Sequence, residues 1–411
     1  MKPGHLSSYF DGVATKRLSS VEVDPRISHQ HEFNGVNAFR RLLGEDRKSL
    51  ETRFVYLGTN EEDTLISDVQ MTWYDSRENH PARSEYRFYY PPNEVTDEAL
   101  PGDLLVIAKI PERETMLVII ARSGSVFESN IIWLFNLDTY QDRNQGRFSF
   151  LEVQDRQDRE LDVASRLILE QIGVELVEEV APGFLDQLIE KFGNSFPTTA
   201  EFSKFARQTL SGVVSREDPD GALYAWVSHE ELLFRTFEKH LVSEQIASGF
   251  TKNDEVDVEA FIKLSKSILN RRKSRAGTGL ENHFEQILKD FNVTYSRGSV
   301  TENKAKPDFI FPHIDKYKDN SFPATNLTML GVKYSCKDRW RQVLSEAIRI
   351  PSKHLLTLEP AISTNQINEM RANRLQLVLP KNVHNTYKTE QMGLLMDVRS
   401  FLALVSELQT A

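Results

Sequence analysis

The chain has 411 residues, 40% of them hydrophobic and 27% charged, and this length favours two or three domains. The formal net charge of −10 by itself argues against a nucleic-acid partner. A single cysteine, Cys336, excludes an intramolecular disulfide framework and a multi-cysteine zinc site and is typical of a reducing compartment. The longest apolar runs, such as 116–121, have only the length of a strand, so we expect a cytoplasmic protein without a signal peptide or a membrane partner.

Short β-type runs separated by turn residues fill the region from Arg53 to about Leu137. These runs cover 54–57, 69–74, 86–90, 104–107, 116–120 and 130–135. Regular short strands with Pro- and Gly-containing turns between them predict a small barrel or sandwich.

Helical spacing of apolar residues begins at about residue 160, first over 161–172 and then over 184–189. The Gly- and Pro-containing stretch 193–198 is the best linker candidate. We therefore expect a first domain over 1–192, with a helical extension from about 160, and a second domain over 199–411.

The second domain alternates helical and extended patterns, which is typical of an α/β fold. We expect helices at 261–269 and 280–291, strands at 309–311 and 327–332, a helix from Trp340, strands at 354–358 and 375–379, and a last helix near 398–408. Residues 261–360 contain 18 Lys and Arg against 10 Asp and Glu, so the basic charge is concentrated in this domain.

Three residues of this basic region carry the chemistry. Asp308 opens a short apolar strand, Lys333 lies within a second one, and Glu346 follows on the next predicted helix. Metal-dependent phosphodiester hydrolysis requires this set, because two carboxylates hold the cation against the phosphate while an ammonium orients or deprotonates the attacking water. Taken singly, the residues also fit a turn, a solvent-facing lysine and a solvated helix.

The usual nuclease pattern places an acid two residues before the lysine, and here that position is Gly331, which cannot bind a metal. Another residue must then supply the second carboxylate, and Glu346 is the natural donor.

Segments 270–277, 306–309 and 332–342 resemble the EcoRII-type restriction endonucleases, with the same order and nearly the same spacing over about 195–385. The resemblance implies a multi-domain protein whose second domain has the restriction-endonuclease-like PD-(D/E)XK fold. In relatives of this family, the acid normally found two residues before the lysine is displaced to the following helix. It makes Asp308, Lys333 and Glu346 the active site, with Mg²⁺ held by Asp308 and Glu346.

Two further residues match the catalytic region of that family. Glu281 matches a helical glutamate that could orient water or a second metal, although a glutamate in the first turn of a helix is also ordinary dipole chemistry. Tyr317 matches a tyrosine near the catalytic strands, and we include both among the catalytic candidates.

Two basic segments are candidates for DNA contact. Lys337, Asp338 and Arg339 stand where relatives read adjacent G·C pairs, with the basic residues on guanine and the acid on cytosine. The second segment has no acidic residue between Phe261 and Arg275. Its basic run predicts phosphate contacts, although such a run is also typical of a solvated surface. Its basic residues are Arg271, Arg272, Lys273 and Arg275.

The first domain resembles the EcoRII effector-binding domain more faintly, over 73–77, 83–87 and 102–108, which implies a β-rich B3-like pseudobarrel. Arg83, Glu85 and Arg87 share one face of a strand and would read effector DNA. The alternative is a ladder of ion pairs between strands. His31 matches a further DNA contact, and a plain surface histidine is the alternative.

These observations predict a Mg²⁺-dependent type II restriction endonuclease that cuts double-stranded DNA, by resemblance at CCWGG. The family implies a homodimer, autoinhibition relieved by a second DNA copy, and a companion DNA methyltransferase. One alternative keeps the nuclease but gives the first domain a different or modified DNA to sense. A remoter alternative is a non-catalytic DNA-binding regulator.

Overall fold

The computed structural model describes residues 5–23, 31–34, 36–59, 63–80, 82–137, 148–153, 161, 163–174, 183–252, 255–336 and 340–410. The chain forms two compact units, one over 1–177 and the other over 178–411 apart from 361–363. None of the described helices is long and apolar enough to cross a bilayer.

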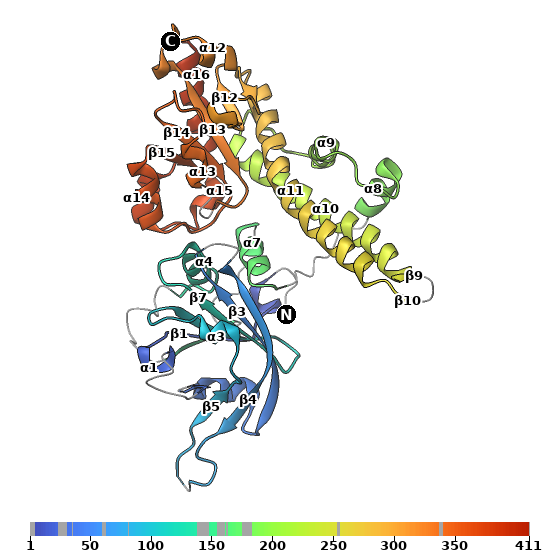
Figure 1. Cartoon of the computed structure of the whole chain (residues 1–411), viewed down its shortest axis with the longest axis vertical. Coiled ribbons are helices and arrows are strands. Elements are labelled where there is room, and N and C mark those ends of the chain that lie inside the picture. The colour runs from blue at the N-terminus through green and yellow to red at the C-terminus, as the bar shows by residue number, and fades with distance from the viewer. Residues whose placement is uncertain are drawn as a thin grey trace. The chain divides into compact units, whose positions relative to one another are not determined.

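The first unit is built on a curled eight-stranded sheet in the order β2-β5-β4-β3-β7-β6-β1-β8 (Figure 1). Neighbouring strands are antiparallel except β3 and β7, which run parallel. The strands are β1 Gly12–Arg17, β2 Glu32–Phe33, β3 Lys48–Leu57, β4 Leu65–Asp75, β5 Tyr86–Tyr89, β6 Leu104–Lys109, β7 Thr115–Ala121 and β8 Ser149–Glu152. The helices are α1 Ser20–Val23, α2 Arg40–Leu43, α3 Glu94–Asp97, α4 Val126–Leu134 and α7 Val163–Gln171.

Strands β6 and β7 are buried along nearly their whole length. Because a strand covered on both faces has no solvent side, both are almost continuously apolar rather than alternating. One core cluster contains Val106 and Ile119 together with residues of α4 and α7, and the other contains Leu105 and Ile120. The expected β-rich first domain is confirmed at this level.

The expected strand at 130–135 is wrong, because these residues belong mostly to helix α4. The Ser125 side chain accepts a hydrogen bond from the Glu128 backbone N–H and caps the helix. Phe127, Ile131 and Leu134 then lie on one buried helical face. A short apolar run does not distinguish a buried strand from a buried helix by its periodicity.

The second unit has a five-stranded sheet in the order β11-β12-β13-β14-β15. Strands β11 to β13 pair antiparallel, and β13, β14 and β15 pair parallel. The strands are β11 Ser296–Arg297, β12 Phe309–Phe311, β13 Thr328–Lys333, β14 Lys353–Thr357 and β15 Leu375–Val378. The main helices are α8 Phe184–Phe192, α9 Thr199–Thr209, α10 Pro219–Ala247, α11 Val258–Asp290, α12 Ile314–Lys318, α13 Trp340–Leu344, α14 Thr364–Ala372, α15 Lys381–His384 and α16 Val398–Thr410.

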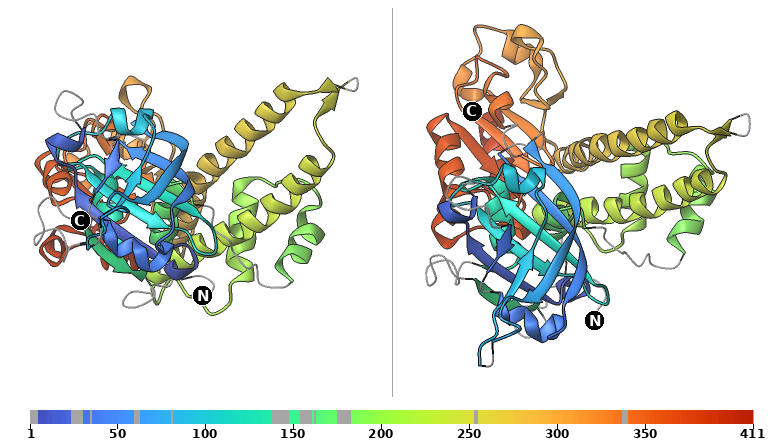
Figure 2. Two further views of the ribbon diagram at one scale, coloured as in Figure 1. Left: turned by 90° about the horizontal axis from the view of Figure 1, so that it is seen from below. Right: turned by 60° about the horizontal axis from the view of Figure 1, so that its bottom comes forward.

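Helices α10 and α11 form a long pair that projects from the sheet and ends in the short strands β9 Thr251–Lys252 and β10 Glu255–Val256 (Figures 1 and 2). The two helices expected at 261–269 and 280–291 are therefore one continuous helix, α11. A Cβ at Gly279 would lie 3.1 Å from Glu230 Oε1 of α10, so this glycine leaves room for the Glu230 carboxylate between the two helices.

The expected linker lies within the second unit. Leu188 of α8 shares a core cluster with Phe202 of α9 and Phe237 of α10, and the Phe196 ring lies 5.2 Å from that of Phe237. The observed division falls near residue 177, upstream of 193–198, because α8 buries its apolar face against α9 and α10.

Candidate active site

The pairing of β12 with β13 brings Asp308 and Lys333 together. Phe309 lies opposite Leu330, so Asp308 comes beside the end of β13. The Val332 backbone N–H donates to Asp308 Oδ2 at 2.6 Å, and Lys333 Nζ lies 3.2 Å from the same oxygen. Both side chains are about one-fifth exposed, at 18% for Asp308 and 21% for Lys333. The pair is therefore fixed by the sheet and remains open to a substrate.

Glu346 lies in a turn just after α13, not on the helix as the sequence analysis expected. Its Oε2 atom is buried and has no hydrogen-bond partner among the described residues. Burial raises the pKa of Glu346 to about 7; Asp308 also raises it, while Lys333 and Lys353 act in the opposite direction. These interactions bring the third expected residue into the neighbourhood of Asp308 and Lys333.

The carboxylates of Asp308 and Glu346 suit a hard divalent cation. In the described part of the chain no group of three or more His, Cys, Asp or Glu could hold a metal by itself. Mg²⁺ is commonly bound by one or two carboxylates together with substrate phosphates and water. The buried, unpartnered oxygen of Glu346 is an acceptor that such a cation would satisfy.

Glu281, on α11, belongs to the same electrostatic neighbourhood. Arg297 Nη2 lies 2.9 Å from Glu281 Oε2. Burial raises the pKa of Glu281, Asp308 raises it further, and Arg297 and Lys333 counteract both. The structure thus brings Glu281 close to the Asp308 and Lys333 pair.

Tyr317, on α12, lies beside the turn that carries Glu346. Its hydroxyl donates to Glu302 and accepts a hydrogen bond from the Arg349 backbone N–H at 3.3 Å. Burial and the Glu302 contact raise the pKa of Tyr317 to about 12. These contacts link Tyr317 to the backbone of the turn, so its hydroxyl is engaged in hydrogen bonds within the protein.

The basic residues of α11 have different surroundings. Arg275 is buried, donates to the Pro197 carbonyl and lies 4.9 to 5.5 Å from three phenylalanine ring centroids. Arg272 pairs with the buried Glu238, and Arg271 stacks over Phe196. Lys273 is exposed. Arg275 is therefore placed in a core rather than on a phosphate-binding surface. Lys337, Asp338 and Arg339 lie outside the described residues.

Two residues near the site were missed by the sequence analysis. Lys353, at the start of β14, is buried, and burial lowers its pKa while Glu346 and Glu302 oppose that shift. Glu302 is the partner of Tyr317. For Lys353, the only signal in the sequence is a lysine at the start of an apolar strand. This pattern does not show that Glu346 and Glu302 lie near it.

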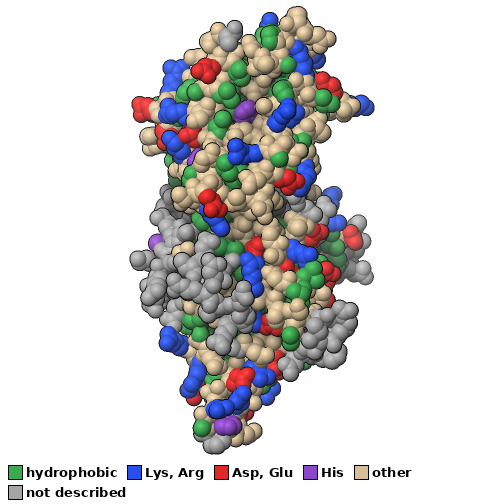
Figure 3. Space-filling model, turned by 90° about the vertical axis from the view of Figure 1, so that its left-hand side faces the viewer, with side chains coloured by type: hydrophobic (Ala, Val, Ile, Leu, Met, Phe, Trp, Pro, Cys, Tyr) green, Lys and Arg blue, Asp and Glu red, His purple; other side chains and the backbone are tan. Residues whose placement is uncertain are grey.

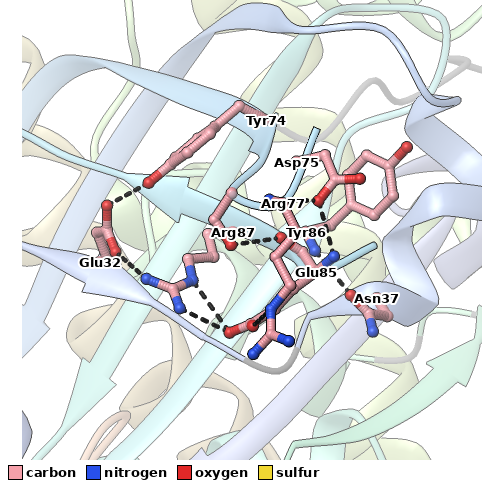
Figure 4. A network of polar contacts seen from close by, with 9 residues as sticks. Glu32, Asn37, Tyr74, Asp75, Arg77, Glu85, Tyr86 and Arg87 are labelled. Atoms are coloured by element: carbon pink, nitrogen blue, oxygen red, sulfur yellow. Dashed lines mark hydrogen bonds and ion pairs between the residues drawn. The ribbon is translucent and has the colours of Figure 1, made fainter. Parts of the chain in front are cut away.

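In the first unit, two of the expected DNA-reading residues, Glu85 and Arg87, belong to a network of ion pairs (Figure 4). Arg87 Nη1 lies 2.9 Å from Glu32 Oε2, and Arg87 Nη2 lies 2.7 Å from Glu85 Oε1. Arg77 pairs with Glu85 at 2.7 Å. Hydrogen bonding from Arg87 is the largest of the effects that lower the pKa of Glu85. The Arg87 and Glu32 pair joins β5 to β2, so the alternative of ion pairs between strands is confirmed for Arg87.

The other two expected contacts of this unit are simpler. Arg83 is exposed in the connection between β4 and β5. His31 is half-buried, with its ring centroid 5.8 Å from that of Tyr90.

Comparison with known proteins agrees with the resemblance seen in the sequence. Residues 234–402 match the family model described as EcoRII C terminal. The type II restriction enzyme EcoRII of Escherichia coli is 39% identical over 209 residues, which are 51% of this chain and 50% of that enzyme. The chain thus matches about half the length of this curated relative.

Two solved structures are also similar. Metal-depleted Ecl18kI in complex with uncleaved, modified DNA has a TM-score of 0.46 at 19% identity, covering 56% of this chain and 86% of that one. The complex of restriction endonuclease PspGI with substrate DNA has a TM-score of 0.42 at 14% identity, covering 57% of this chain and 99% of that one.

Proposed function

We propose that this protein is a type II restriction endonuclease of the EcoRII kind, which hydrolyses phosphodiester bonds in both strands of DNA. The observation that carries the proposal is the pair of Asp308 and Lys333 where β12 meets β13. The partly buried carboxylate of Glu346 interacts electrostatically with both residues. All three residues lie within the part of the chain that matches the EcoRII C-terminal family.

Asp308 and Glu346 would hold Mg²⁺. The bound ion would supply charge stabilisation at the scissile phosphate and acidify a water molecule. Lys333 Nζ, 3.2 Å from Asp308 Oδ2, is placed to orient and activate the attacking water. Glu281, held by Arg297, would accept a hydrogen bond from that water. In-line attack would leave a 5′-phosphate.

The target we propose is CCWGG, read by Lys337, Asp338 and Arg339 through the major-groove edges of G·C pairs. Lys273, Arg271 and Arg272 are the candidates for backbone contacts, which position DNA without reading its sequence. Arg275 is not retained in this set, because its guanidinium is enclosed by aromatic rings.

We assign the first unit to effector DNA, as a B3-like pseudobarrel that relieves autoinhibition when it binds a second site. The curled sheet supports this assignment, with Arg87 on β5, Arg83 and Glu85 in the connection before it and His31 as the proposed DNA contacts. Binding would require Glu85 and Arg87 to exchange their mutual ion pair for base edges. A preformed network of this type holds both side chains in fixed positions.

The charge of the first unit favours a second candidate for its ligand. Residues 1–177 contain 20 Lys and Arg against 30 Asp and Glu, a balance of −10. Among the described residues on the face shown in Figure 3, Lys and Arg are interspersed with Asp and Glu. An acidic unit makes few phosphate contacts, so recognition of a DNA modification is the alternative to strong binding of a second CCWGG copy. A non-catalytic regulator is disfavoured by the complete set of Asp308, Lys333 and Glu346.

A two-fold DNA site requires two copies of a single active site, so we expect a homodimer. Exposed apolar side chains on the outer part of α11 support it, among them Val258 at 57%, Phe261 at 51% and Leu269 at 63% exposure. The proposed activity further implies a companion DNA methyltransferase that protects host DNA in the same cytoplasm.

The test is Mg²⁺-dependent cleavage of unmethylated DNA that carries one, two or three CCWGG sites, with the cut ends sequenced and Lys333→Ala as the control. Cuts at CCWGG that increase with site number and vanish in the variant would support the effector-activated enzyme. Cleavage only of modified DNA would favour the sensing alternative. Absence of Lys333-dependent cleavage on every substrate would overturn the nuclease assignment.

A further inference from the structure

Glu346 lies in a turn, and Asp308 directly follows an irregular loop, although its carboxylate is then held against the end of β13. Glu346 lies beyond the end of α13, and the next residue, Ala347, has a φ of 45°. Upstream of Asp308, Asn303 and Lys304 have φ values of 56° and 61°. Non-glycine residues adopt this left-handed region at a cost, so such segments persist only when their surroundings restrain them.

Glu302 joins these two segments. It lies six residues before Asp308, and its carboxylate accepts hydrogen bonds from the Tyr317 hydroxyl at 2.8 and 2.6 Å. The same hydroxyl accepts a hydrogen bond at 3.3 Å from the backbone N–H of Arg349, in the turn that carries Glu346. One side chain from the loop before Asp308 is therefore linked through Tyr317 to that turn.

Arg349 restrains the same turn from its other side. Its backbone N–H donates to Tyr317 Oη, and its guanidinium donates to the carbonyls of Lys316 at 3.2 Å and Asp319 at 2.8 Å. It also donates to the carbonyls of Tyr317 and Phe322. The turn is thus fixed to α12 and to Glu302 together.

We propose that Glu302 is a positioning residue that sets the separation of Asp308 and Glu346 by tying the loop before Asp308 to the turn that carries Glu346. The inference rests on the proposed function and adds to it the residue that pre-forms the metal-binding pair. Glu302 acts through Tyr317 on the backbone of the turn rather than on the substrate.

The tie depends on an ionised carboxylate. Burial acts to raise the pKa of Glu302, but hydrogen bonds from Tyr317 and the backbone hold it below its usual range. Hydrogen bonds to a charged acceptor are stronger than those between neutral groups. Glu302→Gln keeps the shape of the side chain but loses this charge, and Tyr317→Phe removes the same tie from its other end.

The experiment measures metal binding separately from cleavage. Calorimetric titration of the full chain with Mn²⁺ and the Mg²⁺ dependence of single-turnover cleavage should both show affinity reduced by about 10- to 100-fold in Glu302→Gln and Tyr317→Phe, a range typical of groups that orient metal ligands. Cleavage should recover in part at saturating Mg²⁺. Because both changes break one tie, the double variant should be little worse than either single variant.

The matched control is Tyr387→Phe, which removes a buried tyrosine hydroxyl of the same unit that donates to the Glu359 carbonyl at 2.7 Å. Its metal affinity should equal that of the wild type, and its melting temperature shows the effect of losing a buried hydroxyl alone. Wild-type Mn²⁺ affinity in Glu302→Gln, or a loss no greater than in Tyr387→Phe, would overturn the positioning role. Failure of the wild type itself to bind metal or to cleave would instead overturn the proposed function.

Discussion

At the scale of single residues, Glu346 combines two properties that are rarely found together. It is a partly buried carboxylate, and one of its oxygens has no hydrogen-bond donor among the described residues. An unpaired buried acceptor destabilises the folded state unless a proton or a cation satisfies it. Glu346 therefore destabilises the folded state in the absence of a cation, and a bound cation would offset this loss of stability.

The pH dependence of stability should show this cost. The pKa of Glu346 rises from 4.5 to about 7 on folding, so its contribution to the free energy of unfolding is favourable at low pH and is lost as the pH rises through about 7. Glu346→Gln cannot lose a proton, and we expect its melting temperature, relative to wild type, to increase between about pH 5 and about pH 8 without metal.

Thermal unfolding followed by circular dichroism across that range is the measurement. Mg²⁺ added at about pH 8 should stabilise the wild type more than the variant, because the ion replaces the lost proton. A melting-temperature difference that does not change with pH would contradict the assigned environment of Glu346.

Arg275 shows a second effect at the residue scale. Its neighbours in the sequence are basic, and the pattern predicted a phosphate contact. The residue instead points into the aromatic cluster of Phe196, Phe202 and Phe234. A helix rotates successive residues by about 100°, so members of one basic run have different surroundings.

At the scale of elements, the packing of α13 against β13 leaves little room for an acid at position 331, which supports the prediction that Glu346 supplies the second carboxylate. Gly331 and Lys333 share a face of β13, and a Cβ at position 331 would lie 2.9 Å from Val343 Cγ2 of α13. An acid at 331 would push this helix away. The bare glycine lets α13 lie close to the strand, and the turn after the helix then brings in Glu346.

Gly331→Ala should therefore destabilise the second unit. Overpacking of a tight contact costs about 1 to 3 kcal/mol, and we expect a loss of that size in the free energy of unfolding measured with urea. Gly277→Ala is the matched control, because a Cβ there meets nothing within 4 Å. In a helix interior this change should stabilise by about 0.5 to 1 kcal/mol. Equal effects of the two substitutions would refute the close packing of α13.

At the scale of the whole molecule, charge and apolar surface are distributed unevenly. Residues 1–177 account for the whole net charge of −10, so residues 178–411 are balanced, with 30 Lys and Arg against 30 Asp and Glu. Six of the exposed large apolar side chains lie in the outer part of the α10 and α11 pair. They are Ile246, Val256, Val258, Phe261, Ile262 and Leu269.

If this surface joins two copies, polar substitutions on it should yield a monomer. We expect the double variant Phe261→Ser and Leu269→Ser to halve the mass seen by light scattering. Its cleavage should shift from double-strand cuts to nicks, since each active site cuts one strand. Leu100→Ser, an exposed leucine of the first unit, should leave the mass unchanged. A double variant that stays dimeric would exclude this face.

The sequence by itself determined most of the regular elements and supplied a prediction of the site. Asp308, Lys333 and Glu346 are singled out by their spacing together with the resemblance of the segments around them, and their role stays a prediction. The elements β6, β7, α7 and α16 could be predicted because their apolar patterns are local. Tertiary structure decided the rest, since burial and partners come from distant parts of the chain. It made α11 one helix, placed Arg275 in a core, paired Arg87 with Glu32, and brought Glu302 to the turn beside Glu346. In each case the residues in contact are far apart in the sequence, so a local pattern does not predict the contact. The hydrophobic effect is not directional, and the final packing of the chain decides which residues become partners.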